Sequence, residues 1–119
     1  MLHGTDTMAY TSSLLSFVLE NLNKTVCITG SQIPLSELRN DAAENLLGAL
    51  LVAGPFLIPE VVLYFNSKLI RGNRASKVAS DKLAAFNSVN YQLLGEFGVT
   101  FDVKWDLILS SQRGELKLA

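Results

Sequence analysis

Two short apolar runs, each preceded by a segment of helical character, constrain the fold of this chain more than any other feature. Residues 25–29 form a mostly β-branched run, the pattern of a strand that is buried on both faces. A further strand is expected over 60–65, because residues 61–65 are almost all strand-forming residues. Apolar residues recur at helical spacing in residues 9–22 and again after Asn40. This alternation predicts an α/β domain with three layers, in which a Rossmann- or flavodoxin-like parallel sheet lies between helices.

The first helix, residues 9–22, is expected to pack an apolar stripe against the sheet, because its apolar residues follow the spacing of one helix face. The stripe consists of Leu14, Leu15, Val18, Leu19 and Leu22. Ser12 and Ser16 fall on the opposite side of the helix, where we expect solvent.

The second helix should begin with Asn40 as its N-cap, with Asp41 and Glu44 in the favourable first turn, and end near Gly54. It lies within the apolar run 46–58 over most of its length. Because that run is too short to span a bilayer, we expect a buried helix. Its apolar residues are Leu46, Leu47, Leu50 and Leu51.

The second half of the chain suggests a hairpin followed by shorter elements. Asn66 and Ser67 have turn chemistry, so residues 68–70 should pair back on the strand over 60–65. The remaining expectations are a helical turn over 82–86, a loop over 87–90, strands over 99–103 and 106–109, a turn at Gly114 and a strand fragment over 116–118.

Composition excludes several classes of protein. The chain has 119 residues, one domain's worth or less, and its 49% hydrophobic and 18% charged residues are typical of a globular core. A net charge of −1 gives no electrostatic reason to expect a nucleic acid or an anionic membrane surface as partner. His3 is the one histidine, and the sequence shows no cluster of metal ligands or phosphate-binding loop, so we expect no cofactor. No secretory signal is visible.

Cys27 is the one cysteine, and it lies inside the apolar run 25–29. A single thiol cannot form an intramolecular disulfide, which fits a reducing compartment. We interpret Cys27 as a small core residue, with a reactive thiol as the alternative.

The stretch most suggestive of chemistry is the turn from Leu2 to Met8, which we interpret as the end of a buried strand, a glycine turn and the start of a helix. In open α/β sheets, ligands bind outside the carboxyl ends of the strands, and Thr5 and Asp6 would lie there. The loop after residues 25–29 leaves the next strand at the same sheet edge, so Ser31 should lie near Thr5. The alternative is that Asp6 only caps the following helix and that Ser31 belongs to an ordinary loop.

Four blocks of sequence resemble the L-asparaginase family, in the order and at the spacing of its type I, cytoplasmic branch. These blocks are His3-Gly4-Thr5-Asp6-Thr7 with Met8-Ala9-Tyr10-Thr11, Leu15-Ser16-Phe17 with Leu19-Glu20-Asn21-Leu22, Thr29-Gly30-Ser31-Gln32-Ile33-Pro34-Leu35, and Arg71-Gly72-Asn73-Arg74. The resemblance covers residues 1 to about 90. Ala42 departs from it, because type I relatives usually have glycine there, and Ala75 and Ser76 stand where relatives often have two threonines.

The resemblance implies catalytic roles for Thr5, Asp6 and Lys77, and substrate binding by Thr5, Asp6 and Ser31. A lysine can activate a threonine hydroxyl only after losing its own proton, so a Thr–Lys–Asp relay suits acyl transfer. Asp6 could also hold a substrate ammonium group, which favours a small amino-acid amide as substrate. On composition alone, and without the resemblance, Lys77 is instead interpreted as a solvated lysine in a loop of modest charge.

The activity that the resemblance implies is hydrolysis of L-asparagine to L-aspartate and ammonia through a threonine acyl-enzyme. In that family, a glycine-rich segment supplies the attacking threonine, and a C-terminal domain completes the pocket of a neighbouring subunit in a homodimer or homotetramer. We interpret residues 1–119 as the central part of the N-terminal domain, incomplete at its N-terminus and without the C-terminal domain. We expect this piece to be inactive alone. The alternatives are a catalytically dead remnant or interaction module and, more weakly, lysophospholipid hydrolysis as in animal relatives.

Overall fold

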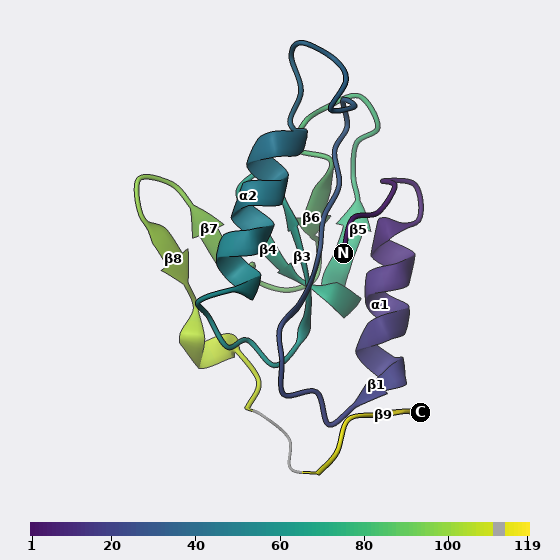
Figure 1. The fold of residues 1–119 in the computed structure, drawn as a ribbon, viewed down its shortest axis with the longest axis vertical. Coiled ribbons are helices and arrows are strands. Elements are labelled where there is room, and N and C mark those ends of the chain that lie inside the picture. Colours follow the sequence, from purple (N-terminus) through teal and green to yellow (C-terminus); the bar gives the residue numbers. More distant parts are fainter. Residues whose placement is uncertain (111–113) are drawn as a thin grey trace.

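The computed structural model describes residues 1–110 and 114–119, and its centre is a mixed five-stranded sheet in the order β2-β3-β4-β7-β8 (Figure 1). The strands are β2 (Val26–Ile28), β3 (Val61–Phe65), β4 (Lys68–Arg71), β7 (Gly95–Phe97) and β8 (Phe101–Val103). Only β2 and β3 are parallel, and the other pairs are antiparallel. The predicted α/β class is confirmed, but within residues 1–110 and 114–119 parallel pairing is limited to this pair and a bridge between Leu2 and Thr29.

The two helices, α1 (Met8–Val18) and α2 (Ala42–Ala53), pack on opposite faces of the sheet, as the three-layer prediction required (Figure 1). Strand β3 is buried along its whole length, and its side chains point alternately to the two faces of the sheet. Val61, Leu63 and Phe65 join the core beneath α1, whereas Val62 and Tyr64 join the core beneath α2. This strand is the centre of the molecule.

Helix α1 ends four residues earlier than predicted. Leu19 and Glu20 form a short strand, β1, which pairs antiparallel with β9 (Lys117–Leu118) near the C-terminus. The inner face also differs, because Ser12 is fully buried while Leu14 is 48% exposed. The buried hydroxyl costs little, since Ser12 donates to the Met8 carbonyl, one turn earlier.

Small residues on that face of α1 let another segment approach closely. A Cβ on Gly72 would lie 2.9 Å from the Ser16 Oγ and 3.0 Å from the Ser12 carbonyl oxygen. Gly72 begins a 3₁₀ turn, η1 (Gly72–Arg74), which leads into β5 (Ala75–Lys77). This close packing sets the position from which Lys77 projects.

Helix α2 is not the buried helix that its leucines suggested. Its buried residues are Asn45, Gly48, Ala49 and Val52. The leucines at positions 46, 47, 50 and 51 are 38% to 60% exposed, so they lie on the outer face. The reason is steric: a Cβ on Gly48 would lie 2.2 Å from the Tyr64 ring, so the aromatic ring of β3 packs against the small side of the helix.

The predicted hairpin is confirmed, and the later elements are only partly as expected. Asn66 and Ser67 have positive φ angles and form the two-residue turn between β3 and β4. The predicted helical turn over 82–86 is wrong, because Phe86 opens a strand, β6 (Phe86–Ser88), which pairs with β5. That strand also replaces part of the loop expected over 87–90. The predicted strand over 106–109 is a 3₁₀ turn instead, η2 (Trp105–Leu107).

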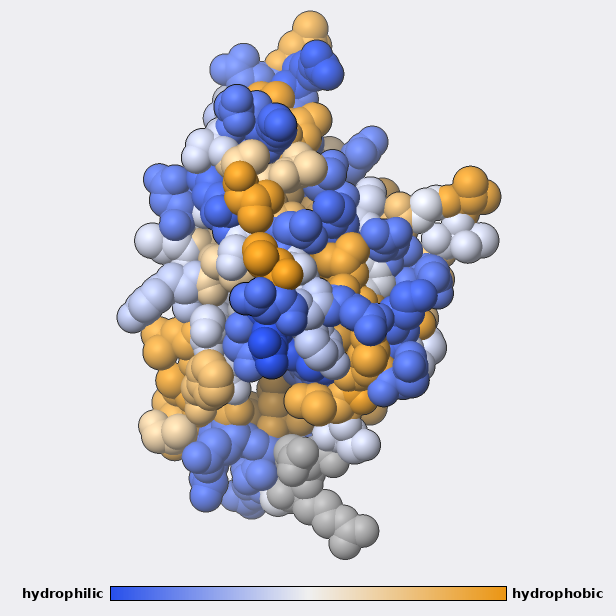
Figure 2. All heavy atoms as spheres, turned by 180° about the vertical axis from the view of Figure 1, so that it is seen from behind, coloured by the Kyte–Doolittle hydropathy of each residue, from blue (hydrophilic) through white to orange (hydrophobic). Residues whose placement is uncertain are grey.

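Among the described residues, no helix is long and apolar enough to cross a bilayer. Figure 2 shows that hydrophilic and hydrophobic residues are interleaved over the face turned away from the viewer in Figure 1.

Candidate active site

The turn after Leu2 and the loop after β2 lie side by side. The His3 N–H donates to the Thr29 carbonyl oxygen over 2.8 Å, and the Thr29 N–H donates to the Met1 carbonyl oxygen over 2.9 Å. A Cβ on Gly30 would lie only 2.2 Å from the His3 carbonyl oxygen, so glycine is required where the two segments meet. Leu2 is 66% exposed rather than buried, because among the described residues its only sheet partner is Thr29.

Lys77 brings the predicted catalytic residues together. Its Nζ donates to the Thr5 hydroxyl over 3.0 Å and to the Asp6 carboxylate over 3.1 Å. The lysine lies 72 positions after Thr5 and reaches it from the end of β5, which packs against α1. The Lys77 side chain is 20% exposed, whereas the Asp6 side chain is 96% exposed. The alternative of a fully solvated Lys77 is therefore wrong.

Asp6 does not cap the helix, contrary to one interpretation of the sequence. Thr7 occupies the N-cap position of α1, and it makes no side-chain cap hydrogen bond. The Asp6 carboxylate turns to Lys77 instead. An exposed ion pair of this kind contributes little to stability, because water screens it. Its open carboxylate oxygens remain free to accept hydrogen bonds from a ligand.

His3 stabilises the turn that carries Thr5. Its Nδ1 lies 2.8 Å from the Gly4 carbonyl oxygen, and its Nε2 lies 2.9 Å from the Thr11 hydroxyl. A carbonyl can only accept, so Nδ1 donates to Gly4, and the ring is held by hydrogen bonds at both nitrogens. In the described part of the chain, no group of three metal-ligating side chains includes this histidine.

Ser31 lies in a hollow of about 520 Å³ beside this turn. Its wall also includes His3, Gly4, Gln32 and Pro34. Ser31 thus lies at the expected edge of the sheet, although no hydrogen bond among the described residues joins it to Thr5, Asp6 or Lys77. The hollow touches the turn through His3 and Gly4, whereas Thr5, Asp6 and Lys77 are not among its lining residues.

The roles of two polar residues that organise this edge, the N-cap residue of α2 and a residue of its first turn, were missed from the sequence. Asp41 accepts the backbone N–H groups of Gln32 and Ile33. Asn45, which is 3% exposed, donates to the Gly30 carbonyl oxygen and accepts from the Asn66 N–H. The available signal was a polar residue at an inward helical position, but the Asn40-Asp41 pair was interpreted only as capping chemistry. Asn40 accepts the Ala42 N–H over 3.0 Å, but the N-cap position of α2 is occupied by Asp41 and not, as predicted, by Asn40.

Cys27 is a core residue, as expected. It is 5% exposed, and burial raises the pKa of its thiol to about 12. Because the thiolate is the reactive form, this burial excludes the alternative of an activated thiol.

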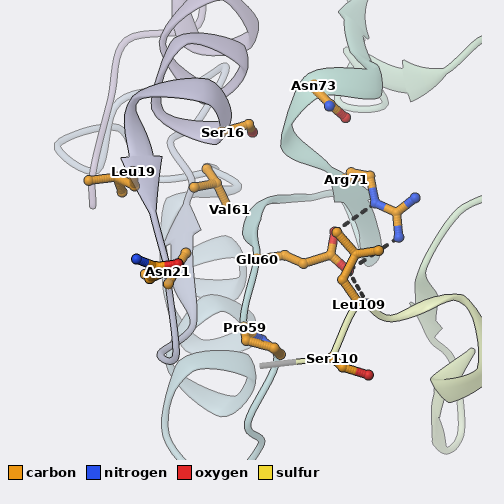
Figure 3. A pocket seen from close by; sticks show the side chains of 11 residues that line it. Ser16, Leu19, Asn21, Pro59, Glu60, Val61, Arg71, Asn73, Leu109 and Ser110 are labelled. Carbon is orange, nitrogen blue, oxygen red and sulfur yellow. Dashed lines mark hydrogen bonds and ion pairs between the residues drawn. The ribbon is translucent and has the colours of Figure 1, made fainter. Parts of the chain in front are cut away.

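A second hollow, of about 190 Å³, lies at the opposite end of β3, and Figure 3 shows its wall. Glu60 and Arg71 form a largely buried ion pair there, with 2.6 Å between Oε1 and Nε. Hydrogen bonding to Glu60 raises the pKa of the Arg71 guanidinium above its usual value. The Glu60 carboxylate also accepts the Leu109 N–H over 2.7 Å. The Glu60–Arg71 ion pair thus lies at the amino end of β3, the opposite end from the Thr5 turn.

The fold and the Thr–Lys–Asp cluster define an α/β protein with a polar site at the carboxyl ends of its parallel strands. The chain belongs to the asparaginase family, because the family model "Asparaginase, N-terminal" matches residues 1–109. It is 59% identical over 99 residues to "L-asparaginase 1" of Escherichia coli strain K12, covering 83% of this chain and 29% of that protein.

Two further similarities agree with the family. The chain is 52% identical over 108 residues to "60 kDa lysophospholipase" of Homo sapiens, covering 91% of this chain and 19% of that protein. The crystal structure of L-asparaginase I from Vibrio cholerae superposes with a TM-score of 0.91 at 50% identity, covering 98% of this chain and 36% of that chain. The chain therefore spans 19% to 36% of the length of these relatives.

Proposed function

We propose that residues 1–119 form part of the active site of an L-asparaginase, which hydrolyses L-asparagine to L-aspartate and ammonia. The contact of Lys77 with both Thr5 and Asp6 carries this proposal, because it assembles a base, a hydroxyl and a carboxylate at one strand end. Membership of the asparaginase family supports it. The domain assignment follows: these residues are the central part of the N-terminal domain of such an enzyme.

The proposed roles divide the reaction between proton transfer and substrate binding. A threonine hydroxyl attacks the side-chain amide carbon, forming an ester and releasing the amide nitrogen as ammonia, and water then hydrolyses the ester. By resemblance, the attacking threonine belongs to a glycine-rich segment, which residues 1–119 do not include. Lys77 takes up the proton through the Thr5 hydroxyl, and Asp6 holds both Lys77 and the substrate ammonium group. Ser31 lines the substrate pocket through its loop.

The expected setting follows from the same resemblance. We propose a homodimer or homotetramer working in the cytoplasm, without a cofactor, and the single buried thiol fits a reducing compartment. A cluster of charged and hydroxyl groups favours a small amino-acid amide over a lysophospholipid, although one relative bears the latter name.

The test is ammonia release from L-asparagine by the natural gene product that contains this chain, compared with its Thr5→Val variant. Removing the hydroxyl while keeping the side-chain shape should lower turnover about 100-fold or more. Lysophosphatidylcholine hydrolysis is measured alongside with the same preparations. Turnover of the lipid without turnover of asparagine, or full asparaginase activity in Thr5→Val, would contradict the proposal.

A further inference from the structure

Two polar side chains at the start of α2, those of Asp41 and Asn45, hydrogen-bond the loops around the candidate site. Asp41 accepts the Gln32 N–H over 3.1 Å and the Ile33 N–H over 3.0 Å. Its other oxygen lies 3.3 Å from the Asn45 side-chain nitrogen. A carboxylate that accepts several N–H groups at once holds the backbone strongly, because charge-assisted hydrogen bonds are about twice as strong as neutral ones.

Asn45 extends this anchorage to the neighbouring strand. Its amide nitrogen donates to the Gly30 carbonyl oxygen over 2.9 Å, and its amide oxygen accepts the Asn66 N–H over 3.1 Å. The loop after β2 and the turn after β3 are therefore both bonded to one helix. A neighbouring contact ties the same loop to the segment beyond Lys77, because the Gln32 side chain donates to the Ser80 and Lys82 carbonyl oxygens.

The anchored loop forms part of the wall of the hollow beside Thr5. Gly30, Ser31 and Gln32 all line it, and the two N–H groups that Asp41 holds immediately follow Ser31. Among the described contacts, Asp41 itself makes none with Thr5, Asp6 or Lys77. Asp41 does not line the hollow, so its influence on a ligand there passes through its neighbours, which are the Ser31 loop and the first residues of α2, Ala42 and Ala43.

We propose that Asp41 is a positioning residue that fixes the Ser31 loop for substrate binding. Asn45 holds the same loop through a hydrogen bond to Gly30, the first residue of that loop. This role rests on the proposed asparaginase function. Loosening a wall that binds substrate and transition state alike weakens binding without slowing the chemical step. Asp41 should therefore affect KM rather than kcat, in contrast to the Thr5–Lys77 pair.

The experiment measures asparagine kinetics of the natural gene product with Asp41→Ala, Asp41→Asn and, as control, Glu44→Gln. Asp41→Ala removes every acceptor and should raise KM about tenfold, the effect of losing about 1.4 kcal/mol of binding, with kcat within about threefold. Asp41→Asn keeps one acceptor oxygen and should fall between Asp41→Ala and the unchanged protein. Glu44 lies exposed in the same helical turn, and Glu44→Gln should leave both constants unchanged.

Hydrogen exchange provides a readout that is independent of turnover. The Gln32 and Ile33 amides should exchange faster in Asp41→Ala, while amides of β3 keep their protection. If Asp41→Ala does not fold, Asp41→Asn gives the same KM test and the same exchange test. The positioning role would be contradicted if a folded Asp41 variant of an active protein kept an unchanged KM. It would also be contradicted if the kcat of that variant fell in parallel with its melting temperature. A natural protein without asparagine turnover would instead contradict the proposed function.

Discussion

At the scale of single residues, Lys77 and Asp6 show what the sequence could and could not indicate. Asp6 before a helix has the pattern of an N-cap, yet the structure places Thr7 there and turns Asp6 to Lys77. No periodicity relates Thr5 to a lysine 72 positions later, so only the family resemblance predicted their contact. Capping rules describe how a side chain satisfies the free N–H groups of the adjacent helix end. They carry no information on an ion pair with a lysine from a distant strand.

We predict that Lys77→Arg does not support turnover, although it keeps the positive charge. The proposed role requires the Lys77 amine to accept a proton, which an arginine in a protein does not do. Turnover of asparagine should fall about 100-fold or more in both Lys77→Arg and Lys77→Met. Lys104→Arg, at a lysine whose side chain is 51% exposed, is the matched control and should keep full activity. Full turnover in Lys77→Arg would exclude proton transfer by this residue.

At the scale of elements, long-range pairing explains why some predicted boundaries are wrong. Strands β2 and β3 were predicted correctly, because each is a run of consecutive apolar residues. The end of α1 depends instead on β9, near the other end of the chain, and β6 depends on pairing with β5. Leu19 lies on the apolar stripe of a helix pattern and Phe86 at the end of a predicted helical turn, and only pairing with distant residues places both in strands. The outward leucines of α2 follow likewise from the ring of Tyr64 on the sheet.

We predict that Gly48→Ala destabilises the protein, against the usual trend for a helix. In an unconstrained helix, alanine is favoured over glycine by about 1 kcal/mol. Here the added Cβ would lie 2.2 Å from the Tyr64 ring, and overpacking of this kind costs about 1–3 kcal/mol. The net free energy of unfolding should therefore fall, as measured by urea denaturation. Gly98→Ala is the matched control, because a Cβ there meets nothing within 4 Å. Gains in stability for both variants would show that Tyr64 moves away freely.

At the scale of the whole molecule, the largely buried ion pair and the proposed active site lie at opposite ends of β3. The loops at its carboxyl end carry the proposed site, whereas Glu60 at its amino end binds Arg71 and the Leu109 N–H (Figure 3). Arg71 also donates to the Leu107 carbonyl oxygen and lies over the Tyr91 ring at 5.0 Å. These contacts attach the segment after β8 to the centre of the sheet. The pair was not predicted, because the resemblance drew attention to Arg71 only as part of a turn.

We predict that Glu60→Gln lowers the free energy of unfolding by about 3 kcal/mol, because it leaves the Arg71 charge without its partner in a largely buried site. The matched control is Asp102→Asn, which breaks an ion pair whose side chains are 51% and 67% exposed and should cost at most about 1 kcal/mol. Urea denaturation of the purified protein gives both values.

The double variant Glu60→Leu with Arg71→Leu separates an unpaired charge from lost packing. If the penalty in Glu60→Gln comes from the orphaned guanidinium, removing both charges should recover a large part of the loss, as apolar replacement of buried pairs often does. The alternative outcome is that the double variant loses as much free energy of unfolding as Glu60→Leu and Arg71→Leu lose together. The pair would then stabilise this end of the sheet through its hydrogen bonds to the segment after β8. Because this end lies away from the Thr5 turn, KM for asparagine should stay unchanged in every folded variant of the pair.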